Sequence, residues 1–239
     1  MKTSRILVWD LPLRVFHWLL AISFAGALLT AESERVRDLH VLLGYTVVGL
    51  LGFRILWGFL GTRHARWSSF AYGPKAVLSY LRSLLTRNPV HYVGHNPAGS
   101  WVIYVMVALG LVTGISGYGV YTDVGGKWIE SLHEGAADVM LALVLVHVAG
   151  VVVSSLVHRE NLVAAMLTGR KLGQPREAIG RTRWAIAVAL AAGVAVLWSG
   201  VVDVPGLPGP SAQTANVKRH GGDRPDAHPR ASRPSKHES

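Results

Sequence analysis

Four histidines lie in or beside long apolar runs of this sequence, where an imidazole without a partner is energetically costly. His133 and His147 share one run, "LHEGAADVMLALVLVHVAGVVVSSLVH", and are fourteen residues apart. On a helix, fourteen steps of about 100° leave both rings on nearly the same face, roughly 21 Å apart along the axis. One helix can therefore serve two sites at different depths. His17 and His40, in two other runs, are candidate partners.

The composition indicates that these runs lie in a lipid bilayer. The chain has 239 residues, of which 50% are hydrophobic and 16% charged, no cysteine, and a mean hydropathy of +0.33. Five near-continuous apolar runs cover about residues 15–29, 39–60, 101–121, 132–157 and 184–202. The first crosses a bilayer only if residues 11–30 are counted, and "WDLPLRVFHW" is a poor apolar region for a cleaved signal peptide. We predict an all-α membrane protein, a four-helix transmembrane bundle with a fifth transmembrane helix.

The positive charges predict the orientation of these helices. The segment to Arg14 carries three Lys or Arg residues, the 61–99 connection five and the 158–183 connection six, whereas the alternate connections carry two and one. The positive-inside rule then places the N-terminus and both long connections in the cytoplasm, with the chain in the bacterial inner membrane. The formal net charge of +10 needs no nucleic acid to explain it, because anionic membrane lipid is a sufficient partner.

Three regions follow from this pattern. Residues 1–171 form the bundle, with an amphipathic helix at about 74–87 lying on the cytoplasmic surface. Residues 172–204 form a cytoplasmic connection and the fifth transmembrane helix. Residues 205–239, rich in Pro, Gly, Ser and charge, form a disordered periplasmic tail.

The predicted helix directions place the four histidines at two depths. His40 and His133 lie at the outer ends of their helices, and His17 and His147 lie deeper toward the cytoplasm. Two noncovalent haems with two imidazole ligands each need this arrangement, and the absence of cysteine excludes covalent attachment through C-x-x-C-H. Taken singly, His17, His40 and His133 are more typical of hydrogen-bonding or snorkelling residues at the interface, whereas the depth of His147 in its apolar run favours a functional partner equally well. A metal ion without haem needs further ligands, and a proton relay does not explain the matched depths. The sequence therefore predicts two haem b groups.

Two arginines are candidate partners for haem propionates. Arg54 follows His40 by fourteen residues, which places it on the same helix face at the depth of the inner pair. Arg14 lies beside His17 at the start of the first helix. Either arginine could instead reach lipid phosphate at the interface. Glycines in the second and third helices allow close approach of a flat macrocycle or of a neighbouring helix.

Four blocks of the sequence resemble the prokaryotic cytochrome b561 family, which includes the b-type subunit of membrane-bound nickel-iron hydrogenases. They contain "LPLRVFHWLL", the His-to-Arg spacing of the second run, "GHNPAGSW" and the histidine pair of the fourth run, over about residues 8–171. The resemblance implies a dihaem four-helix core with His17, His40, His133 and His147 as iron ligands. It also implies electron transfer between the quinone pool and a periplasmic redox partner, such as a c-type cytochrome, a hydrogenase or another dehydrogenase. The fifth helix and tail lie outside it.

Two polar residues before the third apolar run are candidate ligands of quinone or of a haem propionate. His95 and Asn96 precede the third run at its cytoplasmic end and could donate hydrogen bonds to quinone or to a propionate, although Asn96 before Pro97 also suits a helix cap.

One alternative function is a stand-alone superoxide:quinone oxidoreductase. The net charge of minus two on the outer loops argues against it, because these loops would repel an anion. The other is a non-redox membrane adaptor, which has no use for four depth-matched histidines.

Overall fold

Four long helices form the body of the protein. The computed structural model describes residues 4–86 and 88–202. The long helices are α1 (Leu11–Thr30), α2 (Arg37–Leu60), α4 (Pro97–Tyr121) and α5 (Gly126–Val157). All four are long and apolar enough to cross a membrane. The predicted four-helix transmembrane bundle is therefore confirmed.

Local sequence signals explain where these helices begin. The side chain of Asp10 accepts a hydrogen bond from the Leu13 N–H and caps α1, with Pro12 in the first turn. Asn96 caps α4 in the same way before Pro97. At α5 the chain turns through Gly125 with a φ of 87°, and this helix begins six residues earlier than the apolar run at 132 indicates.

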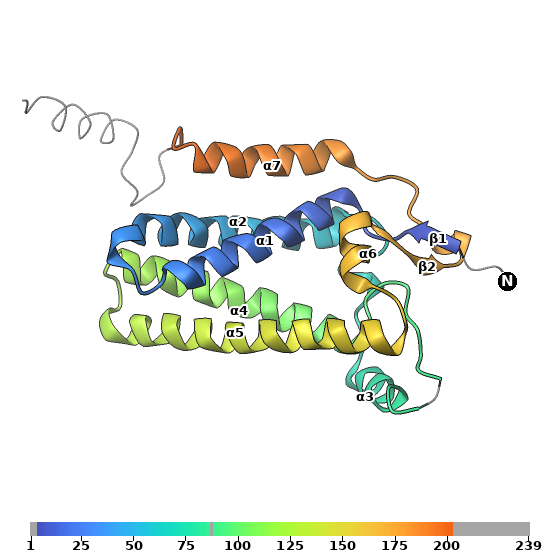
Figure 1. Ribbon diagram of the computed structural model, residues 1–239. Coiled ribbons are helices and arrows are strands. Elements are labelled where there is room, and N and C mark those ends of the chain that lie inside the picture. The colour runs from blue at the N-terminus through green and yellow to red at the C-terminus, as the bar shows by residue number, and fades with distance from the viewer. Residues whose placement is uncertain (1–3, 87, 203–239) are drawn as a thin grey trace, which may run out of the picture.

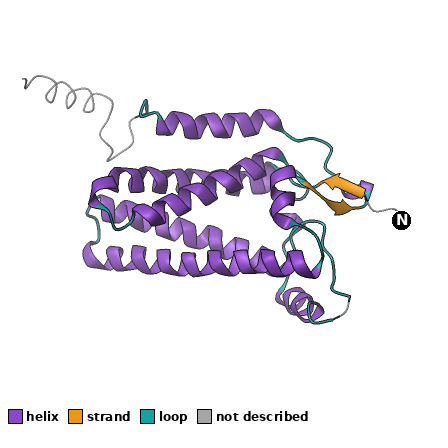
Figure 2. Cartoon of the chain, in the orientation of Figure 1, coloured by secondary structure: helices purple, strands orange, loops and turns teal. Residues whose placement is uncertain are grey.

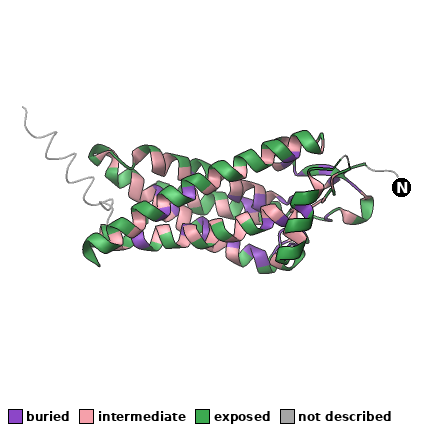
Figure 3. Cartoon of the chain, turned by 90° about the horizontal axis from the view of Figure 1, so that it is seen from below, coloured by how far each residue is buried: buried purple, intermediate pink, exposed green. Residues whose placement is uncertain are grey.

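The helices pack as two antiparallel pairs, α1 with α2 and α4 with α5, and α2 also packs on α4 (Figure 1). Figure 2 shows how completely helix dominates the chain. The outward surfaces of the long helices are largely exposed in Figure 3, as expected for helices that face lipid. The densest cluster of buried apolar side chains instead lies at the end of the bundle where α1 begins, which the positive charges predict to be cytoplasmic, around Val8, Leu13 and Trp57.

Short elements gather at that end of the bundle (Figure 1). They are α3 (Pro74–Ser83), α6 (Leu162–Thr168) and an antiparallel pair of strands, β1 (Ser4–Leu7) and β2 (Arg170–Gly173), together with single turns at Trp67–Ser69 and Pro175–Glu177. A further single turn, Glu34–Val36, joins α1 to α2 at the opposite end. The sequence analysis did not predict the strands or α6. The amphipathic helix expected over 74–87 ends at Ser83, where the Ser83 hydroxyl bonds back to the carbonyl of Tyr80 and competes with the helical pattern.

The fifth apolar run forms α7 (Trp184–Trp198), which lies along α1 and also contacts α2 (Figure 1). Its fifteen residues extend about 22 Å, less than the roughly 30 Å of a bilayer core. The indole N–H of Trp198 donates to the Thr46 hydroxyl at 2.9 Å, in the middle of α2. Crossing of the membrane by residues 184–202 stays a prediction, and the predicted tail from residue 205 lies outside the described residues.

Candidate haem-binding sites

The structure brings the predicted outer pair together. The ring centres of His40 on α2 and His133 on α5 are 6.3 Å apart, with ring planes at 88°. A metal–imidazole bond is about 2.0–2.1 Å long, and the ring centre lies about 1.1 Å beyond the bonded nitrogen. The ring centres of two ligands on opposite sides of one metal are therefore roughly 6.3 Å apart. The observed separation therefore matches two imidazoles on opposite sides of one iron.

Backbone carbonyls of the other two helices orient these two rings. The Nδ1 of His40 lies 2.9 Å from the carbonyl oxygen of Ala27 on α1, and the Nδ1 of His133 lies 2.9 Å from that of Thr113 on α4. Because a carbonyl only accepts, each Nδ1 carries the proton and each Nε2 keeps a free lone pair. This is the usual second partner of a metal-bound histidine. All four long helices thus contribute to the outer site.

The predicted inner pair is near but less closely joined. His17 on α1 and His147 on α5 lie close enough for their charges to interact, but within the described residues their rings make no direct contact with each other. The Nδ1 of His17 is buried and has no hydrogen-bond partner, and its ring packs edge-on against Trp18 at 5.2 Å. The inner site therefore contains two nearby imidazoles, of which His17 has a buried nitrogen without a hydrogen-bond partner.

Arg54, near the end of α2, is buried rather than extended to the surface. Its side chain is 2% exposed, and its Nη1 donates to the Ala65 carbonyl at 3.1 Å. The guanidinium carbon lies 4.1 Å from the ring centre of Trp67 and 5.7 Å from that of Phe70, while Nη2 has no partner. A guanidinium held by rings on one side and unbonded on another is suited to an anion such as a carboxylate.

Arg14 faces α6 at the same end of the bundle. One terminal nitrogen donates to the carbonyl of Leu167, and its Nε is buried without a partner. Arg14 therefore ties α1 to α6 and still has one N–H to offer.

His95 lies between two aromatic rings, with ring centres 4.7 Å from Trp9 and 4.4 Å from Phe70. Burial, and after it the charges of Arg54 and Lys171, lower the pKa of His95 to about 3. His95 is therefore a neutral imidazole with one donor and one acceptor, and its Nδ1 has no partner. The oxygen of Asn96, in contrast, is occupied by the Gly99 N–H at 2.7 Å in the helix cap.

The unsatisfied polar atoms test whether haem suits these residues. Within the described chain, the buried side-chain nitrogens and oxygens without a partner are those of Arg14, His17, Trp18, Ser23, Arg54 and His95. Five of these six side chains, all but Ser23, lie in the half of the bundle predicted to be cytoplasmic, where a haem with two anionic propionates would offer them partners.

The space beside His40 and the number of available metal ligands also favour haem. A Cβ at Gly44, one turn inward from His40, would meet no heavy atom within 4 Å, which leaves room for a flat macrocycle. Gly110 and Gly114 on α4 instead admit Leu51 and Val48, so these glycines serve helix packing. No cluster of three or more His, Cys, Asp or Glu side chains occurs in residues 4–86 and 88–202 that could hold a bare metal ion. The residues present therefore suit haem.

A polar cluster that was not predicted from the sequence lies near β1 and β2. Lys171 is 6% exposed, lies 3.5 Å from Glu160 and donates to the Tyr92 carbonyl; burial lowers its pKa although Glu160 opposes this. His64 is held by the Glu177 carbonyl at 2.8 Å, and burial lowers its pKa. Asp10, fully buried, was also missed. Of the three, only Asp10 had a sequence signal, the helix-capping position before Pro12.

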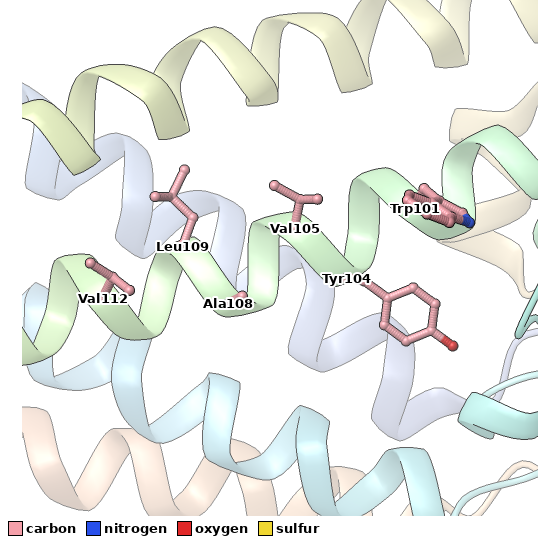
Figure 4. A pocket seen from close by; sticks show the side chains of 6 residues that line it. All are labelled: Trp101, Tyr104, Val105, Ala108, Leu109 and Val112. Carbon is pink, nitrogen blue, oxygen red and sulfur yellow. The ribbon is translucent and has the colours of Figure 1, made fainter. Parts of the chain in front are cut away.

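An apolar groove of about 530 Å³ runs along α4 (Figure 4). Its lining residues are Trp101, Tyr104, Val105, Ala108, Leu109 and Val112. Tyr104 points away from Val105 and Leu109, toward the loop after α2, where its hydroxyl donates to the Trp67 carbonyl. The groove thus ends beside the rings that contact Arg54 and His95.

Comparison with known proteins agrees with this architecture. Residues 8–169 match the sequence model of the family described as "Prokaryotic cytochrome b561". A protein of Rhizobium leguminosarum bv. viciae is 25% identical over 74% of this chain and 92% of its own length. One of Azotobacter vinelandii is 27% identical, over 72% and 90%. Both are named "Probable Ni/Fe-hydrogenase B-type cytochrome subunit". No solved structure gave a significant match.

The matched region contains the four long helices and all four histidines. Because it covers more than half of the chain, the protein belongs to the prokaryotic cytochrome b561 family, and it is a multi-pass membrane b-type cytochrome that carries electrons on haem b.

Proposed function

We propose that this cytochrome holds two haems and passes electrons between the quinone pool and a periplasmic redox partner. The observation that carries the proposal is the outer pair, whose 6.3 Å ring separation and carbonyl-bound Nδ1 atoms match bis-histidine ligation. His17 and His147 form the second pair toward the cytoplasmic end. Because two histidines would hold each haem, the bound haems would supply electron transfer rather than a site for oxygen or substrate on the metal.

The residues around the pairs have defined tasks in this relay. When bound, haem b supplies a one-electron couple. Ala27 and Thr113 hold the outer imidazoles in the tautomer that leaves Nε2 free. Arg54 and Arg14 offer their unpartnered N–H groups to the anionic propionates of the inner haem.

Quinone reacts at the cytoplasmic end in this proposal. The groove on α4 is open to lipid and ends at Tyr104, whose ring lies 5.6 Å from Phe70, and Phe70 lies 4.4 Å from His95. A neutral His95 can donate one hydrogen bond to a quinone carbonyl without adding a charge. Asn96 supports this role by fixing the start of α4.

The partner is proposed from the relatives' names and from topology. The relatives are named as hydrogenase subunits, so a periplasmic hydrogenase is the first candidate, with a c-type cytochrome or another dehydrogenase as the others. The charge asymmetry supports a bacterial inner-membrane protein with the N-terminus and the strands β1 and β2 in the cytoplasm. The outer pair then lies on the periplasmic side, nearest the partner.

Replacing one ligand at a time tests the pairing. His17→Ala and His147→Ala should abolish one component of a redox titration, and His40→Ala and His133→Ala the other, since a haem held by one imidazole loses much of its binding energy. The purified protein should contain two low-spin haem b per chain by pyridine haemochrome assay. A crossed pattern of losses, or one haem per chain, would refute the proposal.

A further inference from the structure

Asp10 is a buried carboxylate that the electron relay described above leaves without a role. It is 0% exposed and lies directly before α1. Its oxygens accept hydrogen bonds from the Leu13 N–H at 2.9 Å, from the Trp57 indole N–H at 3.1 and 3.2 Å, and from the Thr62 hydroxyl. All of these partners donate, which is the pattern that an ionised carboxylate requires.

No arginine neutralises this carboxylate by direct contact. The ion pairs of residues 4–86 and 88–202 join Glu160 to His91 and Lys171, and none includes Asp10. The charge of Asp10 nevertheless acts on both Arg14 and Arg54. Neutral donors and the N-terminus of α1 therefore hold the anion, and both guanidiniums keep a free N–H for a different anion.

The position of Asp10 links its charge to the inner pair. His17 follows Asp10 by seven residues, two helical turns that place it on nearly the same face about 10 Å further along α1. On α2, Trp57 lies one turn from Arg54. The hydrogen bonds from Trp57 to Asp10 thus fix the helix that carries His17 against the helix that carries Arg54.

We propose that Asp10 is a positioning residue and the fixed counter-charge of the inner haem site, which lowers the midpoint potential of that site in opposition to Arg54. The inference rests on the proposed two-haem function. A buried negative charge stabilises the oxidised, more positive form of a nearby haem, and a buried positive charge destabilises it. The outer pair lies about 21 Å further along α5, where the same charge acts more weakly.

A redox titration of purified protein with three variants tests this. Asp10→Asn removes the charge and keeps the shape, and Asp10→Ser is a second neutral variant that retains a helix-capping oxygen. Thr62→Val is the matched control, because it removes one hydrogen bond to Asp10 and leaves the charge. Haem content and thermal stability are measured on each preparation.

We expect both neutral variants to raise the midpoint potential of the inner component, the one lost in His17→Ala, and to leave the outer component nearly unchanged. Thr62→Val should lower thermal stability without this shift, and Asp10→Asn combined with Arg54→Leu should return the inner potential toward that of the unsubstituted protein. Inner potentials that stay unmoved in neutral variants with two haems bound, or equal shifts of both components, would overturn the inference. One haem in the unsubstituted chain would overturn the proposed function instead.

Discussion

Gly117 allows the ring of His133 to lie against α4, and replacing it with alanine should weaken the outer haem site alone. A Cβ at this position would lie 2.8 Å from Cε1 and 3.0 Å from Nδ1 of His133. Ordinary van der Waals contacts of a Cβ atom begin at 3.4 Å. The ring therefore has to move about 0.6 Å or more away from α4.

This movement acts on the hydrogen bond that orients the ligand. Thr113, whose carbonyl holds the Nδ1 of His133 at 2.9 Å, is on the same helix one turn before Gly117. A shift of about 0.6 Å stretches this contact to roughly 3.5 Å, where a hydrogen bond is effectively lost. Loss of such an outer partner typically weakens metal binding about 10–100-fold, or roughly 1.4–2.7 kcal/mol.

The assay is transfer of haem to excess apomyoglobin, combined with a redox titration of the protein before and after transfer. In Gly117→Ala the outer site should bind haem about 10–100-fold more weakly, so the outer redox component should be lost first. The inner component should be retained. Gly193→Ala on α7 is the control, since its new Cβ would meet nothing within 4 Å. Equal retention of both components, or preferential loss of the inner one, would refute the reasoning.

Three further measurements address other parts of the chain. Trp198→Phe removes the N–H that bonds to Thr46, so the unfolding free energy in detergent should fall by about 1 kcal/mol; an unchanged melting temperature would contradict this. The pKa of His95 is lowered from 6.5 to about 3, so the unfolded state takes up the proton first and stability is lost as the pH falls from 6.5 toward 3, by up to about 1.4 kcal/mol per pH unit. His95→Gln should flatten this dependence, and an unaltered slope would exclude His95 as its source. A reporter fused after Val202 should report the periplasm if residues 184–202 cross the membrane; a cytoplasmic signal would place α7 within one leaflet.

The long helices were predictable because the bilayer imposes both their length and their composition. The second run, expected over 39–60, is the helix Arg37–Leu60, and the third, expected over 101–121, is Pro97–Tyr121. The outer pair followed from simple helical geometry, since His40 and His133 each lie near the outer start of a helix. The orientation of their rings depends on hydrogen bonds to carbonyls of α1 and α4. Residue spacing within one helix cannot predict these contacts between helices.

The end of the bundle that carries β1 and β2 was not predictable in the same way. The strands β1 and β2 have four residues each and are far apart in the sequence. Such short strands have no periodic signal of their own, and tertiary contacts decide whether they form. Arg54 was expected at the depth of the inner pair, but its stacking on Trp67 depends on the path of the loop after α2. Asp10 did have a signal, because an acidic residue two positions before a proline suits a helix cap.

The two candidate sites differ in what controls them. At the outer pair, the groups that orient the ligands are main-chain carbonyls of packed helices, so changes in helix packing alter ligand geometry and haem affinity without moving a charge. Around the inner pair the neighbours are ionisable or charged side chains, Asp10, Arg14, Arg54 and His95. Electrostatic energies between buried groups are large, so single substitutions there should act mainly on potential. If both pairs hold haem as proposed, the potential of the inner site can be adjusted independently of the haem affinity of the outer site.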